Sequence, residues 1–324
     1  MSKAAWRSAA SSTPSSARGI GLRHKISENL TLARNYLREA QKEPDLSWIF
    51  SDLAEYDRLL RLYSSKSLVS ARVLEIGYGA RPYRLIALLS LGTDAWGVDA
   101  EVPILRGSMR EYLAALRTNG LERVVKSLVR RTLFDRAERV AFRAEVERRA
   151  GTLRIDAGRF LVSDAAELDL ETGSFELVIS EDTFEHIAAP SLEALLPKMA
   201  RWLRSDGVAL IRPNIFTGIT GGHLREWSRG SLSDYSGRRK SDPWEHLRED
   251  RYPPDTFLNR FTRADYRRMF RRHFEILEEN VTLPNLGREF FTGDVARELA
   301  RFPEEELFSN QVRFVLRPLP EGTR

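Results

Sequence analysis

The residues with the clearest chemical potential lie in the stretch 73–86, VLEIGYGARPYRLI, where an apolar run ends in an acid and two closely spaced glycines follow. Gly77 and Gly79 have no Cβ, so each can adopt a positive φ and let a ligand approach the backbone. A helix-like pattern follows, and its first turn would present free N–H groups and the positive end of its dipole. Asp99 ends the next predicted strand, and an acid there can accept hydrogen bonds from both hydroxyls of a ribose. The spacing therefore predicts a turn that binds a nucleoside.

Two classes of nucleoside ligand fit this order of elements: dinucleotides and S-adenosylmethionine. A dinucleotide site calls for a third glycine, so that the helix packs closely and a pyrophosphate fits. Pro82 occupies that position, and a proline offers no N–H to a phosphate. Glu75 lies just before the turn, where a carboxylate repels a phosphate but can help to hold a cationic amino-acid group through ordered water. We therefore favour S-adenosylmethionine, with an NAD-dependent oxidoreductase as the weaker alternative.

Together these motifs resemble the class I S-adenosylmethionine-dependent methyltransferases of the type 11-like group, over residues 72–211. Glu75–Gly79 resembles the family's first motif, Asp99 its ribose acid, and Asp164 the acid that bonds the adenine amino group. The stretch 180–187, SEDTFEHI, resembles the loop that faces the methyl group, and 203–208 resembles the Leu-x-Pro-Gly-Gly turn. The resemblance implies cofactor contacts from Glu75, Gly77, Tyr78, Gly79, Asp99, Asp164, Ala165 and Ser180. The chain departs from the family pattern in Arg81-Pro82 and in Ser205-Asp206-Gly207.

Two histidines are the candidates for a base or for orientation of the acceptor. His186 ends the Glu-His pair of the methyl-facing loop, and His223 follows two glycines in the loop after the fifth strand. A structural role stands beside the catalytic one for both, and His246 is a lesser candidate. Glu181 and Asp182 suit either magnesium binding or orientation of the loop. No group of histidines and carboxylates has metal-ligand spacing along the chain, so we expect no metal site.

Asp99 and Asp164 also have structural alternatives. An aspartate at the end of a strand commonly caps the following turn. Asp164 precedes a short helical pattern at which aspartate is a favoured N-cap, and it can cap this helix and bind the cofactor together.

The elements that must position these residues alternate between strand and helix. Strands are predicted at 72–76, 95–98, 159–162, 175–180, 208–211, 274–278 and 312–316. Helices are predicted at 26–43, 46–64, 81–91, 191–204 and 262–270, the last with Thr262 as its N-cap. Alternation of this kind favours an α/β fold, a Rossmann-like, seven-stranded mixed sheet with helices on both faces. The resemblance implies that the two closing strands are the antiparallel pair.

Four segments complete the predicted organisation. Residues 1–25 are interpreted as a disordered tail, 26–70 as an N-terminal helical cap, and 71–324 as the class I methyltransferase domain. Residues 101–154 form a basic helical insertion in that domain, interpreted as an amphipathic lid, with a homodimer surface or a cover over an anionic substrate as alternatives. Residues 213–254 are expected to be a loop that helps to form the substrate pocket.

Composition excludes several classes of protein. The chain has no cysteine, so disulfides, zinc–thiolate sites, iron–sulfur clusters and a cysteine nucleophile are excluded. With 42% hydrophobic and 30% charged residues, bulk disorder is not expected. No apolar run approaches the ~20 residues that span a bilayer, and the N-terminal tail lacks the apolar core of a secretory signal. We expect a cytoplasmic protein, with an organelle transit peptide as the alternative for the Ser-, Ala- and Arg-rich tail.

From these observations we expect an S-adenosylmethionine-dependent enzyme that O-methylates a small or medium-sized acceptor, such as a saccharide, a lipid-linked glycan or a secondary metabolite. A net charge of +5 also permits a nucleic-acid methyltransferase. The chain lacks the Asn/Asp-Pro-Pro-Tyr/Phe stretch of enzymes that methylate base amino groups, and it has no recognisable RNA-binding module. The third hypothesis is a catalytically silent, nucleoside-binding scaffold protein.

Overall fold

The computed structural model describes residues 44–234, 239–252, 254 and 256–320. The predicted tail 1–25 and the helix predicted at 26–43 lie outside these residues. One sheet runs through the described chain, built from β1 (Arg72–Ile76), β2 (Asp94–Asp99), β3 (Phe160–Val162), β4 (Phe175–Glu181), β5 (Leu203–Arg212), β6 (Phe274–Val281) and β7 (Val312–Pro318). Its order is β3-β2-β1-β4-β5-β7-β6. Neighbouring strands from β3 to β5 are parallel, whereas β7 is antiparallel to both β5 and β6. The mixed seven-stranded sheet and its antiparallel closing pair are confirmed.

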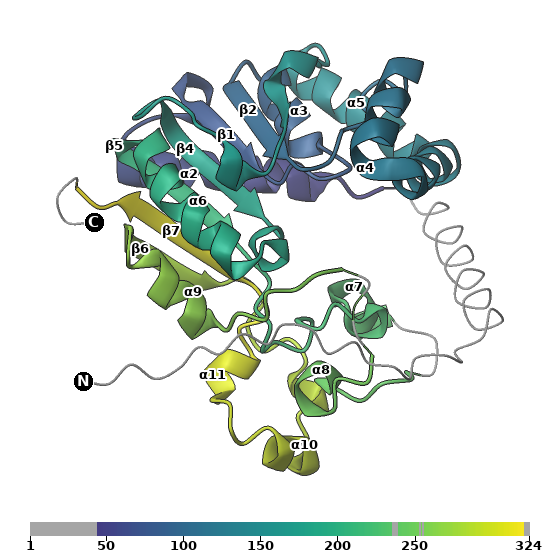
Figure 1. Ribbon diagram of the computed structural model, residues 1–324, viewed down its shortest axis with the longest axis vertical. Helices are drawn as coiled ribbons and strands as arrows, with labels where there is room; N and C mark the ends of the chain where they lie inside the picture. Colours follow the sequence, from purple (N-terminus) through teal and green to yellow (C-terminus); the bar gives the residue numbers. More distant parts are fainter. Residues whose placement is uncertain (1–43, 235–238, 253, 255, 321–324) are drawn as a thin grey trace.

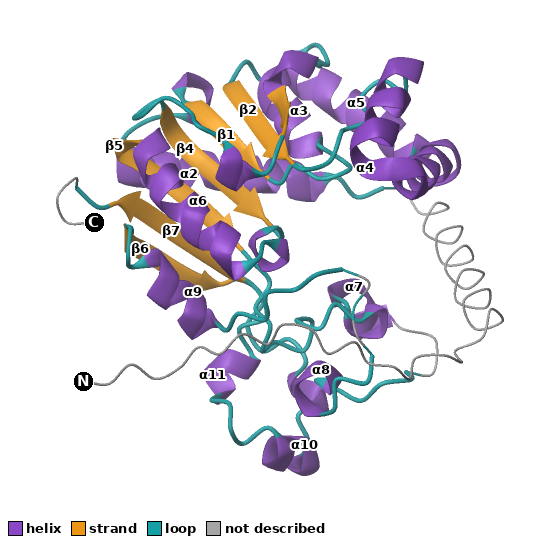
Figure 2. Ribbon diagram, in the orientation of Figure 1, coloured by secondary structure: helices purple, strands orange, loops and turns teal. Residues whose placement is uncertain are grey.

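Helices cover both faces of this sheet (Figure 2). The longer helices are α2 (Ser47–Ser64), α3 (Tyr83–Ser90), α4 (Met109–Val129), α5 (Arg136–Ala150), α6 (Ala189–Trp202) and α9 (Arg263–Phe270). Short helices are α7 (Arg229–Asp234), α8 (Glu245–Arg248), α10 (Gly293–Glu298) and α11 (Glu304–Leu307). Single helical turns lie at Leu68–Ser70, Arg130–Phe134, Ala157–Arg159, Ala165–Glu167, Phe184–His186, Arg225–Trp227 and Arg288–Phe290.

Strand alternation divides the core into two layers. In β1, Val73 packs with α2, α3 and α5, whereas its neighbour Leu74 packs with α6 and α9. The same alternation separates Ile179 from Val178 in β4. Successive residues of a strand point to opposite faces, so these unbroken apolar strands fit a sheet that is covered on both sides. Because β1, β2 and β4 run parallel, their carboxyl ends meet at one edge of the sheet, and the turns that follow these strands lie there.

Local signals set several boundaries. The capping box between Thr262 and Asp265 starts α9, as the sequence predicts. The expected start of the fifth strand at Val208 is wrong: β5 begins at Leu203, which pairs with Phe175, and the register shifts before Leu177. Gly207 permits this irregularity, because a Cβ there would lie 3.1 Å from each of three backbone carbonyl oxygens.

The basic insertion is helical and unevenly packed. Its first helix, α4, starts only at Met109, where Ser108 and Glu111 form a capping box, and it is interrupted at Gly120. The second helix, α5, buries Phe142, which stacks on Tyr83 of α3 at a ring-centroid distance of 4.4 Å. The insertion thus rests on the sheet domain through α5, whereas most apolar side chains of α4 are exposed. No described helix is both long and apolar enough to cross a membrane.

The described part of the segment 213–254 contains helices α7 and α8 and is not an open loop. It packs with residues of α10 and α11 around its own apolar cluster, which includes Trp227, Trp244, Leu299 and Phe308. Figure 1 shows this helical group below the sheet, beyond the strands. The backbone after β5 therefore belongs to a packed body that can hold a side chain such as His223 in a fixed place.

Candidate functional site

The glycine turn after β1 has the backbone shape that the sequence predicts. Gly77 and Gly79 have φ values of +81° and +65°. A Cβ on Gly77 would lie 2.2 Å from Oγ1 of Thr183, so glycine is needed where the turn meets the loop after β4. A Cβ on Gly79 would meet nothing within 4 Å. Gly77 therefore permits close packing, and Gly79 opens onto free space that a ligand can use.

Asp99 holds this turn in place from the end of β2. Its Oδ2 accepts a hydrogen bond from the N–H of Gly79 at 2.8 Å, and its Oδ1 accepts one from the N–H of Glu101 at 2.9 Å. The structural reading of Asp99 is thus confirmed, and it does not exclude the functional one. Each carboxylate oxygen has a second lone pair, so the group keeps the capacity to accept from a diol.

The side chains of three other expected cofactor residues form hydrogen bonds with the protein backbone. The Tyr78 side chain is buried, and its hydroxyl donates to the carbonyl oxygens of Glu101 and Leu161 at 3.1 and 3.3 Å. Ser180 Oγ donates to the carbonyl oxygen of Ile76 at 2.8 Å and ties β4 to β1. Asp164 accepts from the N–H of Ala166 at 2.9 Å, so it caps the turn that begins at Ala165. The Asp164 carboxylate remains exposed, whereas Tyr78 and Ser180 can reach a ligand only through their backbone.

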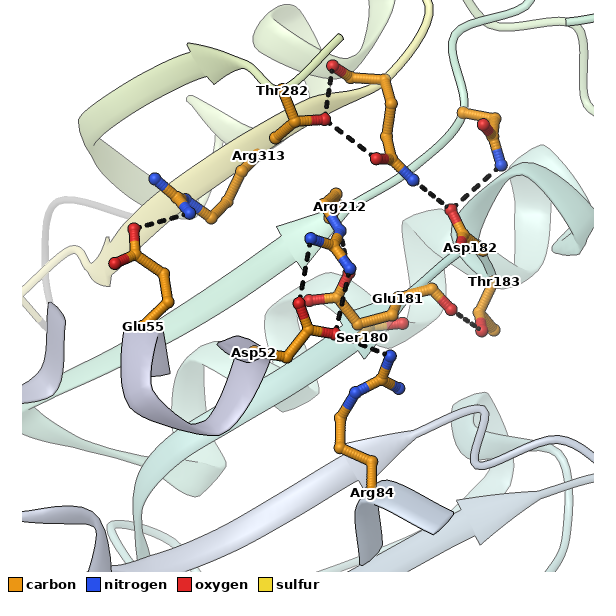
Figure 3. A network of polar contacts seen from close by, with 12 residues as sticks. Asp52, Glu55, Arg84, Ser180, Glu181, Asp182, Thr183, Arg212, Thr282 and Arg313 are labelled. Carbon is orange, nitrogen blue, oxygen red and sulfur yellow. Dashed lines mark hydrogen bonds and ion pairs between the residues drawn. The ribbon is translucent and has the colours of Figure 1, made fainter. Parts of the chain in front are cut away.

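Glu75 belongs to a buried ionic network that the sequence did not reveal. Figure 3 shows the part of this network that includes Asp52, Arg84 and Arg212. Its Oε1 accepts from Arg84 at 3.0 Å, and Arg84 also pairs with Asp52 of α2 at 3.1 Å. Arg212 of β5 joins Asp52, at 3.2 Å, to Glu181 of β4. The network couples α2 to three strands immediately behind the glycine turn.

Acids outnumber arginines in this network. Among the described residues, the cations that pair with Asp52, Glu75 and Glu181 are Arg84 and Arg212, so a shared proton would bring the group to neutrality. Burial raises the pKa of Glu75, and it raises the pKa of Glu181 to about 7 although both arginines oppose the shift. Oε2 of Glu75 has no hydrogen-bond partner in the described chain, and it is available to a cationic ligand group or an ordered water.

The two candidate histidines, 37 positions apart in the sequence, lie side by side. Their rings meet edge to face, with centroids 5.0 Å apart and an interplanar angle of 89°. His186 ends the helical turn after β4, and its Nδ1 lies 3.0 Å from the carbonyl oxygen of Phe257. This contact assigns the proton to Nδ1 and leaves the lone pair on Nε2. Burial and the neighbouring His186 and His246 lower the pKa of His223 to about 4, so its ring is neutral at pH 7.

Glu185 joins the histidine pair, and together Glu185, His186 and His223 form the His–Glu cluster. Each offers one ligand-type atom, and these atoms lie within 4.8 Å of one another. Glu185 is buried, and its Oε1 accepts from Nδ2 of Asn214 at 2.6 Å. Burial, with the nearby Asp182 carboxylate, raises the pKa of Glu185 to about 8. Spacing along the chain gave no sign of this cluster, because the second histidine comes from a different loop.

Tight packing fixes the second histidine. His223 adopts a left-handed backbone with φ +52°, which is uncommon for a residue other than glycine. A Cβ on Gly222 would lie 2.6 Å from the His246 ring, whose Nε2 is 2.8 Å from the carbonyl oxygen of Phe216. His246 is therefore a buried support beneath the loop, and it is His223 that faces His186.

A cavity of about 970 Å³ opens between the glycine turn and the insertion. It extends from Gly79 along α3 to α4 and α5, and it reaches Arg225 near His223. Ten lining residues are Arg or Lys and two are acidic, so its wall is strongly basic. Apolar residues such as Ile86, Phe142 and Ile155 line the remainder.

A family model described as a methyltransferase domain matches residues 106–211, from the insertion to the end of β5. This match supports the resemblance to class I methyltransferases that the sequence motifs indicate. The match supports the prediction of an S-adenosylmethionine-dependent methyltransferase. No curated protein matches the chain.

Three solved structures illustrate the similarity of fold. A Pyrococcus horikoshii OT3 protein is 16% identical, with 86% of this chain and 94% of that chain covered and a TM-score of 0.42. An S-adenosylmethionine-dependent methyltransferase from Methanosarcina mazei is 15% identical, with coverage of 81% and 98% and a TM-score of 0.42. The 1,6-didemethyltoxoflavin-N1-methyltransferase of Burkholderia thailandensis is 16% identical, with coverage of 93% and 92% and a TM-score of 0.40.

The structure has groups that fit S-adenosylmethionine, the cofactor that the sequence resemblance implies. Open space at Gly79 leaves room for a ligand against the backbone, and the Asp99 carboxylate keeps lone pairs for the ribose hydroxyls. The unpartnered Oε2 of Glu75 suits the cationic amino-acid end, through water.

Proposed function

We propose that this methyltransferase O-methylates a small or medium-sized acceptor that carries an anionic group, such as a saccharide phosphate, a phosphate-bearing lipid-linked glycan or an acidic secondary metabolite. The observation that carries the proposal is the basic cavity between the glycine turn and the insertion. A volume of about 970 Å³ suits a ligand of that size.

The cavity wall favours an anion because several of its cations are fixed by neutral groups. Arg131 donates to the carbonyl oxygens of Ile104 and Leu105, and Arg139 donates to the carbonyl oxygen of Arg131. Burial lowers the pKa of Arg139, and repulsion from the nearby Arg131 adds to this shift. An anionic acceptor would relieve this repulsion, and planar guanidinium groups suit carboxylates and phosphates.

The chain's own residues would organise the transfer. When bound, S-adenosylmethionine supplies a methyl group on a cationic sulfur, and transfer to a hydroxyl yields a methyl ether, S-adenosylhomocysteine and one proton. His186 and His223 would face the acceptor hydroxyl and assist the loss of its proton. The insertion would exclude water from the cavity and align the acceptor oxygen.

The proposal can be tested with methyl-labelled S-adenosylmethionine and a matched panel of hydroxylated acceptors, each with and without a phosphate or carboxylate. We expect labelled product from the anionic members, with the neutral partners poorer substrates. Preference for the neutral members would contradict the anionic acceptor. Labelling of RNA or DNA, with binding that falls steeply with salt, would support the nucleic-acid alternative. Cofactor binding without turnover across the panel would support the silent scaffold protein.

A further inference from the structure

We propose that the His–Glu cluster of Glu185, His186 and His223 binds a divalent first-row transition-metal cation beside the methyl-transfer site. The ligand atoms of the three side chains already lie within 4.8 Å of one another, so small side-chain rotations bring them around one ion. Two imidazoles and one carboxylate form a nitrogen–oxygen set that leaves other coordination positions open. Magnesium and calcium prefer oxygen ligands alone, so a cation such as Mn²⁺, Co²⁺, Fe²⁺ or Zn²⁺ fits better.

The surroundings of His186 and Glu185 support ligation. A metal-bound histidine commonly donates its second N–H to a carbonyl group, which fixes the ring and its tautomer. His186 has this arrangement, with Nδ1 3.0 Å from the carbonyl oxygen of Phe257. Asn214 holds one Glu185 oxygen at 2.6 Å, whereas the other oxygen is buried without a hydrogen-bond partner in the described chain. A cation would satisfy this buried oxygen, which otherwise carries a desolvation cost.

The backbone conformation of His223 also supports a metal site. Its left-handed conformation is unfavourable for a histidine, and such strain persists only where the surrounding packing holds it. Here the packing comes from Gly222 against the His246 ring. The result is a second imidazole held edge to face against the first, although its loop follows a different strand.

The position suggests a role in the reaction, and this part rests on the proposed function. Thr183 precedes Glu185 by two residues and contacts the glycine turn. Its Oγ1 lies 3.5 Å from the Gly77 carbonyl oxygen, so the cluster lies close to this turn. An acceptor hydroxyl that binds the cation would have a lower pKa and release its proton to solvent. Its oxygen would then attack the methyl carbon as the carbon–sulfur bond breaks. The histidines would thus assist proton loss as metal ligands.

Cobalt titration tests the site without any substrate. Full-length protein is stripped with a chelator and titrated with Co²⁺, with visible absorption and metal content as readouts. We expect one Co²⁺ per chain with the ligand-field bands of nitrogen–oxygen coordination. His223→Asn suits the left-handed backbone, and Glu185→Gln keeps the Asn214 contact. Each should weaken Co²⁺ binding at least tenfold. His273→Gln, at the opposite end of the strands, is the matched control and should bind as wild type does.

Binding of S-adenosylhomocysteine to the same proteins checks that the variants fold. We expect this binding to persist in both cluster variants. Absence of stoichiometric Co²⁺ binding by the wild type would overturn the metal site, as would equal Co²⁺ affinity in the wild type and both cluster variants. These titrations contain no acceptor, so a failure here leaves the proposed O-methylation standing. Conversely, Co²⁺ binding by a protein that methylates none of the panel would refute only the proposed function.

Discussion

His186 and His223 meet edge to face at a centroid distance of 5.0 Å, although one follows β4 and the other follows β5. Each ring is held by a separate support. A contact with the Phe257 carbonyl oxygen fixes His186, whereas the packing of Gly222 against His246 fixes the loop that carries His223. Three segments of chain thus converge beyond the sheet, on the side where the parallel strands end. This convergence brings two histidines that are distant in sequence into direct contact.

Gly79→Ala should reduce cofactor binding with little effect on the fold. A methyl group there meets no protein atom within 4 Å, so the stability cost is the left-handed backbone, about 1–2 kcal/mol. The same methyl group would occupy space that a ligand uses against the turn. We expect at least a tenfold loss of S-adenosylhomocysteine affinity by calorimetry.

Gly173→Ala is the matched control, because Gly173 also has a positive φ, +63°, with nothing within 4 Å of an added Cβ. It lies in the turn before β4, at the edge of the sheet opposite to the glycine turn. Both variants should lose similar stability in thermal unfolding, and only Gly79→Ala should lose affinity. Equal affinities in the two variants would remove the glycine turn from the cofactor site.

Asp99→Asn should also weaken cofactor binding. The amide replaces one acceptor oxygen with an NH₂ group, which must face the N–H of either Gly79 or Glu101. It also removes the negative charge from the group expected to hold the ribose. We expect S-adenosylhomocysteine affinity to fall at least tenfold, or ~1.4 kcal/mol. Asp94→Asn, at the start of the same strand, changes only solvent-accessible pairs with Arg72 and Arg159 and should bind normally. Comparable losses in both variants would contradict the assignment.

Short-range signals made much of the fold predictable. The apolar run before Gly77, the acid that ends β2 and the cap at Thr262 each act within a few residues, and the structure contains all three. Segments far apart in sequence were harder to place. Asp52 meets Arg84 and Arg212 only because α2 packs across the sheet. No local pattern distinguishes such an aspartate from an ordinary surface acid of a helix.

The same limit applies to the candidate site. Sequence singled out His186 and His223, yet it gave no reason to bring them together, and it did not include Glu185. The fold of 213–254 could not be predicted from sequence. This segment was expected to be a polar loop because its apolar residues are widely spaced. Trp227 and Trp244 become core residues only against α10 and α11, far along the chain. Packing between distant segments, which periodicity cannot report, decides the position of His223.

Arg139→Gln should raise the KM for an anionic acceptor and leave kcat nearly unchanged. Arg139 lines the cavity and is half-buried, so it would contribute binding that is equal in the ground and transition states. Loss of one charge-assisted contact predicts about a tenfold rise in KM. Arg148→Gln on the same helix is the control, because Arg148 is exposed and pairs with Glu145. A KM unchanged in Arg139→Gln, or raised equally in both variants, would place the acceptor elsewhere.

Because of Glu181, we expect the free energy of unfolding to fall as the pH rises from about 4.5 to about 7. Burial raises the pKa of Glu181 from 4.5 to about 7, against Arg212 and Arg84. The folded state therefore binds the proton more tightly than the unfolded state does. Its stabilising effect is complete below pH 4.5 and is lost as the pH passes the folded-state pKa. The difference corresponds to at most about 3 kcal/mol.

Glu181→Gln removes this proton from the linkage and keeps the hydrogen bond from Tyr56, because the amide oxygen still accepts. We expect the Tm of the wild type to fall between pH 5 and pH 8. The fall in Tm over this range should be smaller in Glu181→Gln by about 5 °C. The exposed Glu193→Gln on α6 should behave as wild type does. Parallel Tm profiles for wild type and Glu181→Gln would mean that Glu181 stays ionised across this range. In that case the shared proton inferred for the network would lie on Glu75 instead, because burial also raises the pKa of that acid.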